Sequence, residues 1–184
     1  YKSGSVYSEL PSSGNGDLTF TRASAATRVN SSGAIEQLSS GVPVIDYSLG
    51  GCPTFLLEPQ RRNLFLNSTT LSTQNVTTAA INYTVSFYGT GTLTFSGTYT
   101  GSLVGSGANT RVSLTLTATA GTLTCTVSGT VTNANFEDNG SGGSANYPTS
   151  YIPTTGATAT RVVANFTRNN VYTNGLISAS GGTW

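Results

Sequence analysis

Few side chains in this sequence can do ionic chemistry, and three of them gather in one short stretch. Glu58, Arg61 and Arg62 lie within five residues, between the apolar runs 55–57 and 64–66. Charged groups beside buried segments are costly unless they are paired. We therefore expect either a charged site that faces a ligand or, the interpretation that we favour, a structural clamp. In the clamp, Glu58 pairs with Arg61 or Arg62, within the chain or between subunits.

The chain lacks the side chains that most hydrolytic sites need. It has no histidine, so a Ser-His-Asp triad is impossible and most transition-metal sites are excluded. Glycoside cleavage needs two acids that face a common cleft, about 5–10 Å apart. Glu137 and Asp138 are adjacent and point to opposite faces of a strand, while Glu36 and Asp46 have no evident partner. We expect no enzyme activity, no metal and no cofactor.

A cluster of polar and aromatic residues late in the sequence suggests a glycan site. A β-sandwich can bind a glycan with an aromatic platform and a few polar groups on loops. The candidates are Asn133, Asn135, Asp138, Asn139, Tyr147 and Tyr151, with Tyr88 and Tyr99 as additional aromatic residues. The alternative is that Tyr147 and Tyr151 pack the returning chain against the sheet.

The composition excludes several classes of partner. Charged residues make up 8% of the chain, against a usual ~25%, and the net charge is +1. Nothing therefore favours nucleic acid or an anionic membrane surface. No apolar run approaches the ~20 residues that span a bilayer. Cys52 and Cys125 could form one disulfide, but Cys125 shares a strand face with Leu123 and Val127, which favours a small buried core residue.

Apolar alternation predicts strands along the chain, with no helical periodicity of useful length. Residues 26–38 are typical of a hairpin with its turn at 30–33, and residues 55–58 of a short buried strand. After residue 66 the alternation is sustained and glycines separate the strands, as in an antiparallel sandwich or barrel. The predicted inward-facing residues include Tyr83, Val85, Phe87, Leu93, Phe95, Val112, Leu114, Leu116, Leu123, Cys125, Ala134 and Phe136.

The sequence thus predicts an all-β chain in four parts. Residues 1–16 are a linker, 17–65 a small β-hairpin unit, 66–160 an antiparallel sandwich, and 161–184 a connection to a following module. The sequence has no methionine, so we expect a processed chain or a segment of a longer protein. Threonine-rich outward faces are expected to be solvated, because unequal loops disfavour the alternative of a flat ice-binding array.

Several separated motifs occur in an ordered series. Residues 17–29 read D-L-T-F-T-R-A-S-A-A-T-R-V, followed by N-S-S-G-A-I-E; V-P, D-Y and G-G-C-P follow; residues 54–68 read T-F-L-L-E-P-Q-R-R-N-L-F-L-N-S; residues 147–161 read Y-P-T-S-Y-I-P-T-T-G-A-T-A-T-R. This series resembles modules of bacteriophage tail-fibre and other virion proteins. Arg62 departs from the pattern, since threonine is usual there, and the stretch 67–83 is shorter than in longer members.

The resemblance implies a jelly-roll sandwich, like those of carbohydrate-binding modules, after the small leading unit. It also implies a virion surface appendage, usually trimeric and assembled in the bacterial host cytoplasm. We therefore expect a non-enzymatic structural and adhesive module of a tail or head fibre, contributing to recognition of a host cell-surface polysaccharide.

Two other functions remain as alternatives. The first is a connector that contacts other virion proteins without binding a glycan, and the less favoured second is a depolymerase domain. The connector predicts that apolar residues of the N-terminal segment are buried only in an oligomer. These residues are Leu18, Phe20, Val29, Ile35 and Leu38.

Overall fold

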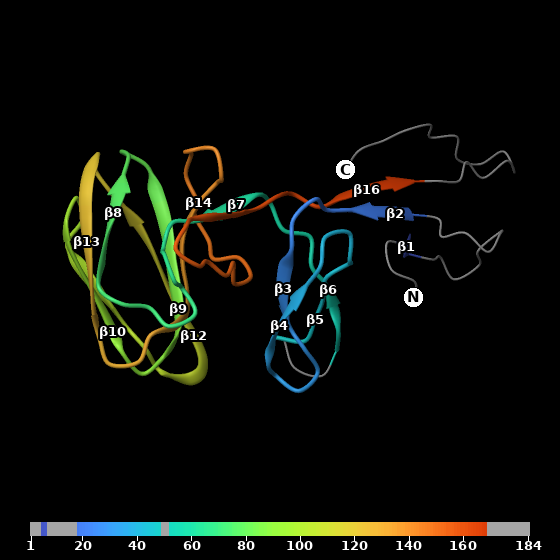
Figure 1. Cartoon of the computed structure of the whole chain (residues 1–184), viewed down its shortest axis with the longest axis horizontal. Coiled ribbons are helices and arrows are strands. Elements are labelled where there is room, and N and C mark those ends of the chain that lie inside the picture. The colour runs from blue at the N-terminus through green and yellow to red at the C-terminus, as the bar shows by residue number, and fades with distance from the viewer. Residues whose placement is uncertain (1–4, 7–17, 49–51, 169–184) are drawn as a thin grey trace, which may run out of the picture. The chain divides into compact units, whose positions relative to one another are not determined.

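The computed structural model describes residues 5–6, 18–48 and 52–168. Every regular element in these residues is a β-strand, so the predicted all-β class is confirmed (Figure 1). Of the expected linker, residues 1–16, only Ser5–Val6 is described, and it forms strand β1. Of the expected connection, residues 169–184 lie outside the described part. The described residues contain no helix long and apolar enough to cross a membrane.

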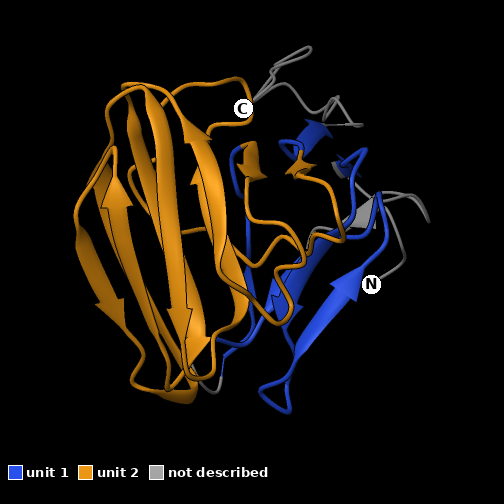
Figure 2. Cartoon of the chain, turned by 60° about the vertical axis from the view of Figure 1, so that its left-hand side comes forward, with its two compact units in different colours: residues 1–59, 162–184 blue, residues 60–161 orange. Residues whose placement is uncertain are grey.

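The chain divides into two compact units, coloured separately in Figure 2. The first unit combines residues 1–59 with 162–184, and the second is the continuous stretch 60–161. The second unit therefore begins at Gln60, before the boundary at 65/66 that the sequence suggested. The difference arises because residues 61–63 form a strand of the second unit's sheet.

The first unit is built from short strands, and its predicted hairpin is confirmed. Strands β3 (Ala26–Val29) and β4 (Ile35–Leu38) pair in antiparallel fashion. Gly33 closes their turn with a φ of 82°, in the left-handed region that glycine adopts without strain. The other strands are β1 (Ser5–Val6), β2 (Leu18–Thr21), β5 (Ile45–Asp46), β6 (Thr54–Phe55) and β16 (Asn165–Arg168), in the sheets β1-β2-β16 and β5-β6.

Packing in the first unit corrects two expectations. The predicted buried strand 55–58 ends at Phe55, and the side chain of Leu57 is 58% exposed. Phe20 and Leu38 are buried within the single chain, so they need no oligomer for burial. The ring of Phe20 lies edge-on to Phe166, with centroids 5.3 Å apart, across the β2–β16 pair.

The second unit is a β-sandwich of two antiparallel sheets, which Figure 1 shows as two layers. The four-stranded sheet has the order β11-β10-β13-β8, and the five-stranded sheet the order β12-β9-β14-β7-β15. The strands are β7 (Arg61–Asn63), β8 (Gln74–Thr78), β9 (Asn82–Gly89), β10 (Thr92–Gly97), β11 (Gly101–Val104), β12 (Gly107–Thr117), β13 (Gly121–Ser128), β14 (Thr132–Asp138) and β15 (Ala159–Arg161).

The core of the sandwich contains the residues that alternation predicted. Val85 and Phe87 of β9 are fully buried, as are Leu123 and Cys125 of β13. The partly buried residues Val112 and Leu114 of β12 pack against this cluster. Cys125 is thus a core residue, and neither it nor the exposed Cys52 forms a disulfide.

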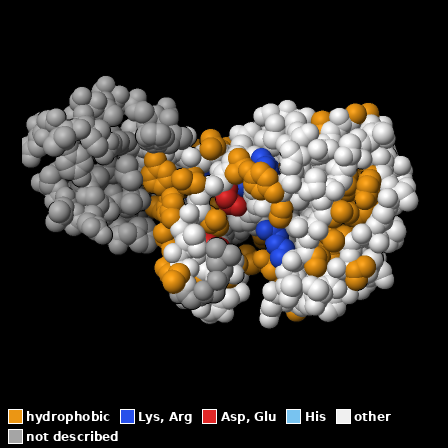
Figure 3. All heavy atoms as spheres, turned by 180° about the vertical axis from the view of Figure 1, so that it is seen from behind, with side chains coloured by type: hydrophobic (Ala, Val, Ile, Leu, Met, Phe, Trp, Pro, Cys, Tyr) orange, Lys and Arg blue, Asp and Glu red, His pale blue; other side chains and the backbone are white. Residues whose placement is uncertain are grey.

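On the face in Figure 3, charged side chains of the described residues are few. The four-stranded sheet contains no charged residue at all. Apart from Val104, its outward positions carry hydroxyl and amide side chains in cross-strand register, such as Thr94 opposite both Ser102 and Thr126. All charges of residues 60–161 therefore lie on the other sheet.

Candidate functional site

A row of polar side chains crosses the outward face of the five-stranded sheet. On β9, Val85 and Phe87 point into the core, so Thr84 and Ser86 point outward. On β14, Phe136 points inward, which leaves Asn135 and Glu137 on the same outward face. The pairing of β9 with β14 then places Asn135 opposite Ser86 and Glu137 opposite Thr84, which assembles the row from strands that are far apart in the sequence.

The segment 144–152, which follows β14, covers this row. Thr84 Oγ1 donates a hydrogen bond of 2.9 Å to Ala145 O, and Asn135 Nδ2 donates one of 3.1 Å to Ser150 O. Asn135 Oδ1 accepts a bond of 3.0 Å from Ile152 N. Polar groups that alternation would leave in water are thus buried but bonded.

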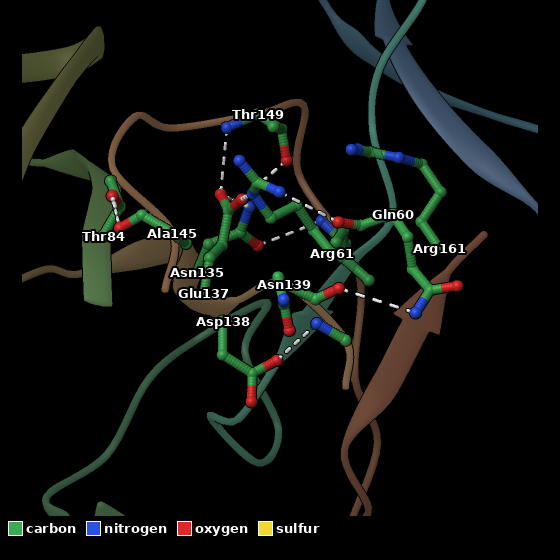
Figure 4. Close-up of polar contacts among 12 residues, drawn as sticks. Gln60, Arg61, Thr84, Asn135, Glu137, Asp138, Asn139, Ala145, Thr149 and Arg161 are labelled. Carbon is green, nitrogen blue, oxygen red and sulfur yellow. Dashed lines mark hydrogen bonds and ion pairs between the residues drawn. The ribbon is translucent and has the colours of Figure 1, made fainter. Parts of the chain in front are cut away.

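Glu137 is the centre of the row and is fully buried. Its Oε1 accepts hydrogen bonds from Thr149 N (3.1 Å) and Asn135 Nδ2 (2.8 Å). Its Oε2 accepts one of 2.6 Å from Thr149 Oγ1. Figure 4 shows Thr149 directed at this carboxylate from the covering segment. Burial raises the pKa of Glu137 above its ordinary value, while the bonds from Thr149 and Asn135 and the positive charge of Arg111 oppose that rise.

Two arginines flank the Glu137 carboxylate without hydrogen-bonding to it. Arg61 of β7 places Nε 3.8 Å from Oε2, and Arg111 of β12 places Nη2 3.7 Å from Oε1. Arg111 Nη2 donates instead to Ser86 Oγ at 2.7 Å, and Arg61 Nη1 donates to Gln60 O at 3.0 Å. The Nε atoms of Arg61 and Arg111 are buried without a hydrogen-bond partner in the described structure.

Tyr147 is the aromatic residue of the site. The guanidinium carbon of Arg61 lies 4.8 Å from the centroid of its ring, within the range of a cation–π contact. The residue Tyr147 is nevertheless 52% exposed. The site therefore presents an aromatic ring to solvent, held from below by a buried arginine.

The residues predicted to bind a glycan differ in their accessibility to solvent. Asn135, Asp138 and Tyr151 are buried, and the hydroxyl of Tyr151 lies 2.9 Å from Ser68 Oγ, which is the packing arrangement given above as the alternative. Asn139 is half-buried and caps its own loop by accepting bonds from Ser141 N and Gly143 N. Tyr147 is the most accessible of the five, and glycan binding by this set stays a prediction.

The arginines of the predicted clamp pair with acids of β14. Arg61 faces Glu137, and Arg62 bonds to Asp138 on the opposite face of the sheet. These contacts give the two adjacent carboxylates of β14 different partners. Glu58 belongs to the first unit, so its predicted pairing with Arg61 or Arg62 stays a prediction.

Sequence reasoning missed Glu137, Arg111 and Thr149 as members of one site. The available signal was that Arg111 is the only charged residue between Arg62 and Glu137. An isolated arginine in an alternating strand indicates an outward position, but it does not identify the carboxylate that it faces.

Comparisons of this chain with protein-family models, with curated proteins and with solved structures find no match.

Proposed function

We propose that this chain is a structural and adhesive module of a bacteriophage virion appendage, a tail or head fibre, that contributes to recognition of a host-surface glycan. In this proposal the sandwich is a jelly roll like those of carbohydrate-binding modules, displayed on the virion surface in a homotrimer. The ordered motif series supports the proposal, together with the all-β architecture.

One observation carries the adhesive half of the proposal: Tyr147 is exposed, and its ring lies against Arg61, which is next to Glu137 of the polar row. Sugars bind to an aromatic face and to a few fixed polar groups beside it. Arg61 supports the ring, and Glu137, fixed by Thr149 and Asn135, holds Arg61 in place. A ring supported in this way loses little conformational entropy on binding, which favours affinity.

Binding of the 184-residue chain to a glycan array and to immobilised bacterial surface polysaccharides tests this function. We expect binding to a subset of glycans that Tyr147→Ala weakens without lowering the melting temperature. If no glycan is bound at concentrations up to the millimolar range, the adhesive half fails and a scaffold remains.

A different observation favours the alternative of a connector to other virion proteins. The outward face of the four-stranded sheet has no charge and exposes the edge residue Val104, with 61% of its side chain accessible. Such a face can pack against another protein with little desolvation cost for charges. Light scattering after size exclusion tests self-assembly through this face, because a stable monomer at micromolar concentration would contradict both a self-assembling connector and the homotrimer of the first proposal.

A further inference from the structure

The charges of residues 60–161 are confined to one sheet. Arg61 and Arg62 lie on β7, Arg111 on β12, Arg161 on β15, and Glu137 and Asp138 on β14. Within residues 60–161 this sheet carries four arginines and two carboxylates.

At the polar row, two arginines face a single carboxylate. One carboxylate, that of Glu137, stands between the guanidinium groups of Arg61 and Arg111, at 3.8 Å and 3.7 Å. Both distances are longer than a hydrogen bond, so neither arginine donates a hydrogen bond to this carboxylate. The two guanidinium groups therefore share one negative charge and keep capacity for a second.

The two arginines differ in how far a ligand can reach them. The side chain of Arg61 is 8% exposed, and its Nε has no hydrogen-bond partner, although a buried donor left unpaired is costly. The side chain of Arg111 is 21% exposed, and its Nη2 donates a hydrogen bond to Ser86 Oγ. Arg111 is therefore the arginine that an incoming anion can contact directly, and Arg61 adds positive charge from below Tyr147.

We infer that the Arg111–Glu137–Arg61 row and the ring of Tyr147 form a subsite for an acidic sugar residue, such as a uronic acid. The carboxylate of the sugar pairs with Nη1 of Arg111, the terminal nitrogen that does not donate to Ser86, and the apolar face of its ring lies on Tyr147. A charge-assisted hydrogen bond of this kind is stronger than one between neutral groups. This inference rests on the proposed adhesive function and specifies its ligand.

The test compares acidic oligosaccharides with their carboxyl-reduced forms, which keep the linkage and ring shape but lose the charge. We expect the full chain to bind a uronic-acid oligosaccharide about tenfold or more tightly than its reduced form, since a charge-assisted hydrogen bond is lost. Arg111→Gln should remove this preference, and Arg111→Lys should restore part of it. Tyr147→Ala should weaken binding of both forms.

Val104→Ala is the matched control, because it truncates an exposed apolar side chain on the uncharged sheet. Melting temperatures of all variants identify any that unfold; if Arg111→Gln does, the comparison of the two sugar forms with the unmodified chain still decides. Equal binding of the acidic and reduced sugars would overturn the acidic subsite but leave the adhesive function standing. Absence of binding to either form, and to neutral glycans, would overturn both.

Discussion

Glu137 is fully buried, and Arg61 and Arg111 lie on either side of its carboxylate. Taking a carboxylate out of water costs several kcal/mol by rough estimate, and attraction to nearby cations repays this only with good geometry. Here the compensation comes from three short hydrogen bonds, from Thr149 and Asn135, while both arginines stay beyond hydrogen-bond distance. Glu137 therefore organises the covering segment as well as the charges.

The raised pKa of Glu137 predicts how stability changes with pH. Because its pKa in the folded chain lies above the ordinary value of 4.5, the folded chain binds more protons than the unfolded chain between these two values. The contribution of Glu137 to the free energy of unfolding is therefore fully present below pH 4.5 and decreases as the pH rises through its folded pKa. We expect wild type to lose stability relative to Glu137→Gln over that window.

Urea unfolding of both proteins across about pH 4 to 8 measures this difference. Glu36→Gln is the matched control, because Glu36 forms a partly exposed surface pair with Arg28. Parallel pH profiles for wild type and Glu137→Gln would contradict the prediction.

The two cysteines should differ in reactivity. Burial raises the pKa of Cys125 to about 12, so its thiol stays protonated at neutral pH and is also shielded from reagents. Cys52 is exposed. In Ellman titration we expect the native chain to react at Cys52 alone and the urea-unfolded chain to react at both cysteines. A Cys52→Ser variant that reacts rapidly in the native state would show that Cys125 is accessible.

At the scale of elements, β7 connects the sheet to the covering segment. Asn63 of this strand donates from Nδ2 to Ala134 O (2.9 Å) and Ile152 O (2.8 Å). Its Oδ1 accepts from Phe65 N (3.1 Å) and Phe136 N (2.9 Å). One buried amide thus fixes a neighbouring strand, the start of the next loop and the returning chain together.

Truncating Asn63 should therefore be costly. We expect Asn63→Ala to reduce the free energy of unfolding by about 3 kcal/mol or more, because it leaves several buried backbone groups without partners. Asn146→Ala serves as control: Asn146 is exposed, its side chain accepts one bond from Asn82, and its loss should cost roughly 0.5–1 kcal/mol. Similar urea midpoints for the two variants would contradict a central role for Asn63.

The sequence predicted those elements whose two faces meet different surroundings. In β9 and β12 apolar and polar residues alternate, because one face of each strand packs into the core. This two-residue period is visible in the sequence. A two-residue strand such as β6 is too short to show this period. The burial of Leu57 was therefore predicted from its apolar side chain alone, and that prediction is wrong.

The grouping of the site residues could not be predicted from sequence patterns, for a different reason. Arg111, Glu137 and Arg61 meet through the strand order β12-β9-β14-β7, in which β7 pairs with a strand more than 70 residues away. Local periodicity assigns a residue to a face of a strand, but it does not determine which strands become neighbours. Tyr147 was predicted as a platform from its residue type, whereas its support by Arg61 depends on this long-range pairing.

For the whole molecule, the second unit is an insertion within the first. The chain enters this unit at β7 and leaves it at β15, and the two strands pair so that Arg61 lies opposite Arg161. The first unit is joined across the insertion by β2 and β16, where Phe20 lies opposite Phe166. Each unit has its own buried cluster, so the second unit satisfies the usual condition for independent folding.

We therefore expect a fragment of residues 60–161 to fold alone and unfold cooperatively, as followed by circular dichroism and by the dispersion of amide NMR signals.

The matched control is a fragment of residues 66–160, cut at the boundaries that the alternation of apolar residues predicted. It lacks β7 and Phe65, and with them Asn63, the pairing partner of β15 in the described sheet and one fully buried ring of the core. Losses of this kind cost several kcal/mol by rough estimate, a large part of a domain's stability of about 5–15 kcal/mol. The shorter fragment should melt at a much lower temperature or remain unfolded. Equal melting temperatures for the two fragments would show that β7 is dispensable and that the sandwich begins where the alternation begins.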